Sequence, residues 1–194
     1  MNDLVTFSGR KASQNKYELE AFRDFLKAKN VTKYMEIGAR HGDSFHFLMS
    51  ALPVGSIGVA VDLPGALWGN LSSRDALRDA VNDLNAKGYF CQYVFLDSQK
   101  PETRKQVMDI AQFDAILIDG DHTLAGVLKD WNNYKDLAKY VAFHDIVGTG
   151  QYEKVFKNPV EVPLLWEELK KDYETIEFID THSKMGIGVV CTSP

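Results

Sequence analysis

Short apolar runs alternate with longer amphipathic segments along most of the chain. Runs that are almost continuously apolar are typical of strands in a parallel sheet whose two faces are both covered. We expect five strands of this kind, at Lys33–Ile37, Ile57–Val61, Tyr89–Leu96, Phe113–Ile118 and Tyr140–Phe143. Strands that alternate with helices predict an α/β fold with a parallel sheet.

The segments between these strands repeat apolar residues at helical spacing, which indicates amphipathic helices. Serines at positions 72 and 73 are suitable N-caps for one helix, and Pro101 suits the first turn of another. The predicted helices span Asn15–Lys29, His41–Leu52, a segment from Ser72 to Gly88, a segment from Pro101 to Ala111, and Thr123–Ala138.

The alternation changes after Asp145. An irregular stretch leads to a helix opened by Pro163, and two strands follow at Thr175–Ile179 and Gly186–Cys191. The short polar turn between these strands predicts an antiparallel hairpin at one edge of the sheet. We therefore expect a Rossmann-like, doubly wound, mostly parallel seven-stranded sheet with an antiparallel C-terminal hairpin edge.

Neither an internal repeat nor a Pro/Gly/Ser linker divides the chain, so residues 1–194 are expected to form one domain, with 1–30 as a helical segment packed on it. The composition, with 45% hydrophobic and 25% charged residues, is ordinary for a globular domain. It excludes disorder, collagen and coiled coil as descriptions of the whole chain.

The net charge of −5 and the lack of dense basic runs argue against a nucleic-acid partner. No apolar run approaches the roughly 18 residues of a membrane span, and residues 1–10 do not resemble a signal peptide. We expect a cytoplasmic protein without a membrane partner. The two cysteines, Cys91 and Cys191, are expected to be reduced core residues.

Each predicted parallel strand ends in a polar or acidic residue. In a doubly wound sheet the carboxyl ends of the strands share one edge, and ligands bind outside it. Any one of these residues is equally well explained as a cap of the next helix. Because all five strands carry one, a shared crevice is the better interpretation. The residues are Glu36, Asp62, Asp97, Asp119, and His144 with Asp145.

The turn after the first strand has the spacing Gly-x-x-x-Gly, at Gly38 and Gly42. It differs from the Gly-x-Gly-x-x-Gly of dinucleotide sites, and it lacks the Lys-Ser/Thr of a P-loop. Glu36 before the turn would repel phosphates but suits a cationic or amine group. Asp62 ends the second strand, where a carboxylate can accept hydrogen bonds from a ribose diol. Together they indicate an adenosyl ligand without phosphates, a description that S-adenosylmethionine (SAM) meets.

On these residues the chain resembles class I SAM-dependent methyltransferases. Within them it is similar to the small bacterial group that includes sugar O-methyltransferases and cephalosporin-hydroxylase-like proteins. The resemblance extends from about Val31 to the final strand. It rests on the segments Glu36–Ser44, Asp97–Thr103, Phe113–His122, Val141–Ile146 and Val162–Leu169.

The resemblance implies a set of SAM-binding residues. Glu36 and Gly38 would hold the methionine end, Asp62 the ribose, and Asp97 with Ser98 the adenine edge. The full set is Glu36, Gly38, Ala39, Arg40, Gly42, Ser44, Asp62, Leu63, Asp97, Ser98 and Asp119.

The resemblance also implies Asp119 and His122 as catalytic residues, because the group's Asp-x-x-His element supplies a metal ligand and a general base. A divalent cation, Mg or Mn, would bind to Asp119, His144 and Asp145. The group has two acidic residues at the last two positions, so His144 departs from its pattern. Magnesium prefers oxygen ligands, and a softer metal such as manganese, iron or zinc, a weaker site, or no metal at all therefore stay open.

The expected function is O-methylation of a small-molecule or sugar hydroxyl, with His122 as the base. A non-methylating SAM-binding or hydroxylase-like relative is an alternative, and an NAD-dependent oxidoreductase is disfavoured by the glycine spacing. For His122, capping of the next helix or a bond to a carbonyl stays open. Trp68 and Tyr152 are candidates for a lid over the acceptor, and a homo-oligomer stays open as a partner assignment.

Overall fold

The computed structural model describes residues 7, 9, 14–66, 71–148, 159–182 and 185–192. Its centre is a seven-stranded sheet in the order β3-β2-β1-β4-β5-β7-β6. Strands β1 to β5 are parallel, and β7 runs antiparallel to both of its neighbours. The fold class and the antiparallel hairpin edge are therefore confirmed. The strands are β1 (Lys33–Ile37), β2 (Ile57–Val61), β3 (Phe90–Val94), β4 (Phe113–Ile118), β5 (Ala138–His144), β6 (Glu174–Phe178) and β7 (Ile187–Cys191).

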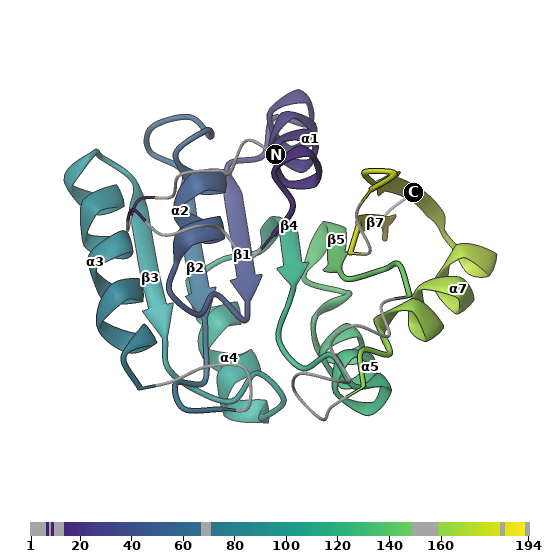
Figure 1. Cartoon of the computed structure of the whole chain (residues 1–194). Coiled ribbons are helices and arrows are strands. Elements are labelled where there is room, and N and C mark those ends of the chain that lie inside the picture. Colours follow the sequence, from purple (N-terminus) through teal and green to yellow (C-terminus); the bar gives the residue numbers. More distant parts are fainter. Residues whose placement is uncertain are drawn as a thin grey trace.

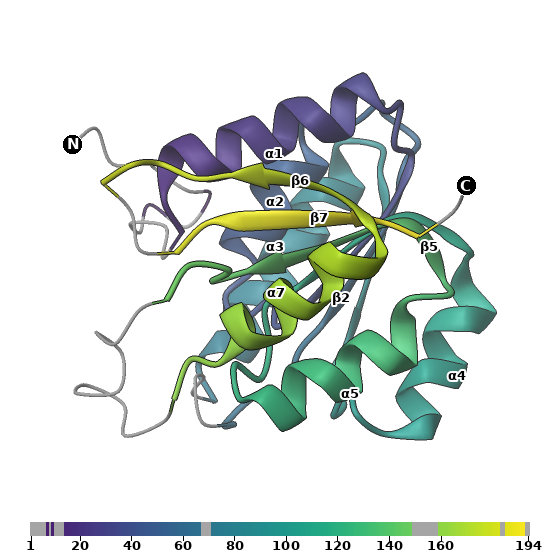
Figure 2. The same ribbon diagram turned by 90° about the vertical axis from the view of Figure 1, so that its right-hand side faces the viewer.

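Helices cover both faces of the sheet (Figures 1 and 2). One layer consists of α1 (Lys16–Ala28), α2 (Asp43–Met49) and α3 (Ser73–Ala86). The opposite layer consists of α4 (Pro101–Ile110), α5 (Leu124–Tyr134) and α7 (Val162–Asp172). Within the described ranges, no helix is both long and apolar enough to cross a membrane.

Two hydrophobic cores follow from the period-two alternation of side chains along each strand. In β1, Ile37 faces one layer and Tyr34 the other, and both are almost fully buried. The core around Ile37 receives side chains from α4, α5 and α7, including Val107, Trp131 and Trp166. The core around Tyr34 receives side chains from α1, α2 and α3, including Phe22, Phe45 and Leu77.

Two predicted helices have wrong boundaries, and the one expected at His41–Leu52 is wrong at both ends because it spans Asp43–Met49. The helix expected to reach Ala138 ends at Tyr134, because Ala138 already pairs with Phe113 of β4 and begins β5. The helix expected from His41 begins at Asp43, because Gly42 has a φ of 79° that is incompatible with a helical turn. Sheet pairing overrides the local apolar spacing at Ala138, and backbone conformation overrides it at Gly42.

Both cysteines are free, as predicted, but only Cys91 is buried. Cys191 ends β7 and is partly exposed, so its assignment to the core was wrong. Cys91 lies on β3, near one edge of the sheet, and β7 lies near the opposite edge.

Helix α1 lies along β6 and β7 (Figure 2). The Asn15 side chain caps its first turn by accepting hydrogen bonds from the backbone N–H groups of Tyr17 and Glu18. Its apolar face, which contains Leu19 and Phe22, is fully buried in the same core as β7 residues. Gln14, which precedes α1, thereby reaches the carboxyl edge of the sheet.

The chain reverses its direction across the sheet between β1 and its neighbour β4. Gly38 follows β1 with a φ of 85°, and a Cβ atom there would lie 2.0 Å from the backbone oxygen of Asp119. Asp119 N in turn donates to Ile37 O at 2.9 Å. The exits of the two strands are therefore in backbone contact, which only glycine permits at position 38.

Replacement of Gly38 by alanine tests this contact, with Gly55→Ala as a matched control. Gly55 also has a positive φ, 92°, but a Cβ atom at this position would meet only open space. We expect Gly55→Ala to lower the free energy of unfolding by about 1 kcal/mol through backbone strain. Gly38→Ala adds the clash and should cost about 3 kcal/mol or more. Equal losses in urea unfolding would contradict the close approach.

Candidate active site

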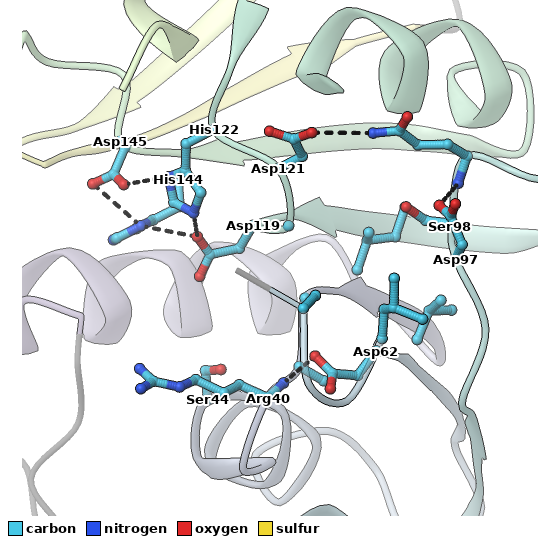
Figure 3. Close-up of a pocket in the computed structure, with 18 of the residues that line it drawn as sticks. Arg40, Ser44, Asp62, Asp97, Ser98, Asp119, Asp121, His122, His144 and Asp145 are labelled. Atoms are coloured by element: carbon cyan, nitrogen blue, oxygen red, sulfur yellow. Dashed lines mark hydrogen bonds and ion pairs between the residues drawn. The ribbon is translucent and has the colours of Figure 1, made fainter. Parts of the chain in front are cut away.

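A cavity of about 660 Å³ opens at the carboxyl edge of the parallel strands (Figure 3). This volume is in the range of small-molecule and cofactor sites. Every residue predicted for SAM, catalysis or metal lines the cavity except Glu36 and Gly42. The expected gathering of strand ends around one crevice is therefore found.

Glu36 lies behind the cavity wall. Its fully buried carboxylate accepts hydrogen bonds from the hydroxyl groups of Tyr34 and Ser44, and of these residues only Ser44 lines the cavity. Burial raises the pKa of Glu36 to about 7, against the lowering effect of the two hydroxyl groups. Glu36 is therefore linked to the cavity only indirectly, through its hydrogen bond with Ser44.

Gly42 also lies outside the cavity lining. A Cβ atom at this position would come within 2.9 Å of side-chain atoms of Ala80 and Leu77 on α3. The second glycine of the turn thus allows close packing of α2 on α3, and its predicted contact with SAM stays a prediction.

Asp62 lies beside Arg40, whose backbone N–H donates to the Asp62 Oδ1 atom at 2.9 Å (Figure 3). Burial raises the pKa of Asp62, and the Arg40 N–H partly offsets this effect. Within the described part of the chain, its buried Oδ2 atom has no hydrogen-bond partner. Since a buried acceptor without a partner is unfavourable, this atom is suited to a hydroxyl donor from a ligand.

Asp97 and Ser98 form the adjacent wall. Asp97 Oδ1 accepts from the backbone N–H of Gln99, so part of this carboxylate stabilises its own turn. The Ser98 hydroxyl donates to Asp130 on α5 at 2.8 Å, and its carbonyl accepts from Tyr134. Ser98 is therefore fixed from behind by α5.

Asp119, His144 and Asp145 meet on the opposite side of the cavity (Figure 3). His144 Nδ1 lies 3.2 Å from Asp119 Oδ1 and 3.4 Å from Asp145 Oδ1. One ligand atom from each of the three residues lies within 4.8 Å of the others. Two carboxylate oxygens and an imidazole nitrogen at these distances can converge on one divalent cation.

The charges of this cluster balance within the protein. Burial disfavours a protonated His144, but the Asp119 and Asp145 carboxylates outweigh it and hold the pKa of His144 well above its ordinary value. Burial likewise opposes ionisation of Asp145, yet His144 and His122 keep its pKa well below the ordinary value. The site therefore favours positive charge between the carboxylates.

His122 adjoins the same cluster. Its Nδ1 atom lies 2.8 Å from Asp145 Oδ2, and its Nε2 atom lies 3.7 Å from Asp119 Oδ1. Thr123, rather than His122, caps α5. The backbone at Asp145 has a positive φ of 62°, a conformation that aspartate tolerates better than most residues. Asp145 there points toward both histidines (Figure 3).

Sequence reasoning missed two residues at this site. Gln14 precedes α1, lines the cavity and donates from Nε2 to Asp119 Oδ2 at 3.0 Å. Asp130 is fully buried beneath Ser98. No local pattern identifies Gln14, which lies 105 positions from its partner, and Asp130 belongs to an ordinary helical segment. The lid candidates Trp68 and Tyr152 lie outside the described residues.

Comparison of this structure with solved structures identifies its fold. No family model matches the sequence, and no curated protein matches it either. A candidate caffeoyl-CoA O-methyltransferase from Staphylococcus aureus superposes with a TM-score of 0.67 at 15% identity, over 93% of this chain and 85% of that protein. The fold is that of the O-methyltransferases.

Two further structures of this fold are complexes with SAH or SAM. An O-methyltransferase from Bacillus cereus in complex with SAH superposes with a TM-score of 0.62 at 15% identity, over 92% of this chain and 82% of that protein. The O-methyltransferase TomG from Streptomyces achromogenes, in complex with SAM, gives 0.64 at 16% identity, over 95% and 83%. At these identities the likeness establishes the O-methyltransferase fold.

The raised pKa of Glu36 leads to a stability prediction. Because the folded protein holds this proton up to about pH 7 while an unfolded glutamate has a pKa of 4.5, stability decreases as pH rises between these values. The contribution is about 2–3 kcal/mol. In Glu36→Gln this decrease should vanish, so the variant gains stability relative to the wild type from pH 4.5 to 7. Urea unfolding across that range measures it, and parallel pH profiles for both proteins would refute the assignment.

Proposed function

We propose that this chain is a SAM-dependent O-methyltransferase acting on a hydroxyl group of a small molecule or sugar. The observation that carries the proposal is the pairing of two features across one cavity. The Asp62 carboxylate has a buried oxygen without a partner among the described residues. Across the cavity lie Asp119, His144 and Asp145 with His122. The first suits a ribose, and the second suits the deprotonation of a hydroxyl.

The residues present fit SAM. Asp62 Oδ2 is available to a ribose hydroxyl, Ser98 and Asp97 form the wall beside it, and Ser44 connects the cavity to the Glu36 carboxylate. No phosphate-binding motif follows β1, and the acidic residues around the cavity favour a sulfonium over a nucleotide phosphate. Bound SAM supplies an electrophilic methyl group, whose transfer to an oxygen leaves S-adenosylhomocysteine (SAH) and a methyl ether.

His122 is the proposed general base. With the proton on Nδ1, which lies 2.8 Å from Asp145 Oδ2, the lone pair is on Nε2 and can accept the hydroxyl proton. Asp145 fixes the orientation of the ring and stabilises the imidazolium that forms. The hydroxyl O–H bond breaks as the O–CH₃ bond forms.

Asp119, His144 and Asp145 are the proposed cation ligands, and their donor atoms lie close enough together for a divalent ion. A bound cation would lower the cost of ionising the acceptor hydroxyl. The imidazole in the set favours manganese, iron or zinc over magnesium. Asp145 can be both a cation ligand and the partner of His122, because its Oδ1 atom faces His144 and its Oδ2 atom faces His122.

The first test is ligand binding. Calorimetry should detect SAH binding and no NAD binding, and transfer of a labelled methyl group from SAM to a panel of hydroxyl compounds should identify an acceptor. Binding of NAD without SAH would contradict the proposal. SAH binding without transfer to any hydroxyl compound would instead favour a non-methylating SAM-binding relative.

Asp62→Ala should weaken SAH binding by about 10- to 100-fold, because it removes a charged acceptor from the ribose. Asp75→Ala is the control, since Asp75 is a highly exposed carboxylate on α3. It changes the net charge equally and should leave SAH affinity unaltered. Calorimetric affinities that match for the two variants would remove Asp62 from the site.

His122→Ala should reduce methyl transfer by about 100-fold or more while SAH affinity stays within about twofold. The control is His182→Ala, because the His182 side chain is 91% exposed in the β6–β7 turn. The rate of methyl transfer under single-turnover conditions is measured separately from SAH affinity. Undiminished transfer by His122→Ala would show that another group accepts the proton.

A further inference from the structure

Gln14 connects the segment before α1 to the cavity. Its Nε2 atom donates to Asp119 Oδ2 at 3.0 Å, and its side chain lines the cavity. Among the described residues before β1, only Gln14 belongs to this lining. The contact therefore brings a residue from the start of the fold to a carboxylate at the end of β4.

The position of Gln14 is fixed by its neighbours. Asn15 caps α1 through its Oδ1 atom, and its Nδ2 atom donates to Asp180 Oδ2 in the β6–β7 turn at 3.1 Å. The backbone N–H of Asp180 donates to Glu18, a fully buried residue of the first turn of α1. These bonds hold the start of α1 against the β6–β7 turn. The position of Gln14 beside the cavity is fixed by them.

The two oxygens of Asp119 have different surroundings. Oδ1 faces His144 Nδ1 at 3.2 Å and His122 Nε2 at 3.7 Å, whereas Oδ2 receives the Gln14 amide. A carboxylate that ligates a metal through one oxygen is oriented by a hydrogen bond to the other, and such outer partners strongly affect metal affinity. The backbone bond of Asp119 N to Ile37 O fixes its main chain but leaves the carboxylate free to rotate.

We propose that Gln14 is a positioning residue of the cation site, whose amide holds Asp119 so that Oδ1 faces His144. This inference rests on the proposed function, because it requires a cation at these residues. It assigns Gln14 a role in the chemistry at the end of β4. In this role Gln14 acts through Asp119 and is not itself a ligand of the cation.

Mn²⁺ binding to the purified full-length chain tests the proposal, with the free ion followed by its electron paramagnetic resonance signal. Gln14→Met keeps the length of the side chain but removes the donor, and Gln14→Ala removes the side chain. Both should weaken Mn²⁺ binding by about 10-fold or more. SAH affinity should fall much less than Mn²⁺ affinity, because Gln14 contacts Asp119 whereas the Asp62 carboxylate lies across the cavity.

Tyr17→Ala is the matched control, since Tyr17 lies in the first turn of α1 and is 59% exposed. It should leave Mn²⁺ affinity unchanged. Wild-type affinity in both Gln14 variants would overturn the inference, as would an equal loss of Mn²⁺ and SAH affinity, which would indicate a general structural role. A wild-type chain that binds SAH but no Mn²⁺ would overturn this inference and the cation site, while SAM binding would stand. A chain that binds neither would overturn the proposed function as well.

Discussion

The backbone contact between the exits of β1 and β4 is the constraint on which the site depends. Gly38 approaches the Asp119 carbonyl more closely than any residue with a side chain could. Because these two strands are neighbours at the point where the chain reverses across the sheet, the contact places the β1 turn beside Asp119. The β2 and β5 exits then follow from pairing with these strands, so that Asp62 and His144 lie on opposite sides of the cavity.

Charge is distributed unevenly around this cavity, and burial with neighbouring charges shifts the pKa values of several groups there. Toward the β1 and β2 exits, burial raises the pKa values of Glu36 and Asp62, since no cation lies close enough to compensate fully. Toward β5, burial acts against charge too, but two histidines and two carboxylates compensate one another. The first region therefore contains carboxylates that are only partly compensated and suits a cationic ligand, whereas the other can exchange protons or hold a metal.

The unusual position in this arrangement is His144, where the group that the sequence resembles has an acidic residue. An imidazole between two carboxylates can hold a proton or give its nitrogen to a metal, whereas a third carboxylate would only add repulsion unless a cation were bound. The cluster is thus compatible with a stable fold both with and without a metal ion. This compensation of charge explains how a buried group of acidic residues can persist at a strand edge.

The sequence by itself determined the order of the elements and the polar ends of the strands, which make Asp62, Asp119, His144 and Asp145 candidates, whereas His122 became a candidate through the resemblance of the Asp-x-x-His element. These features are local, because hydrophobic period and strand-end chemistry are encoded within a few residues. Only the tertiary structure decided that Glu36 lies behind Ser44, that Gly42 serves helix packing, that Ala138 begins a strand, and that Gln14 reaches Asp119. Each of these depends on contacts between segments far apart in the chain, and no local pattern specifies which distant atoms meet.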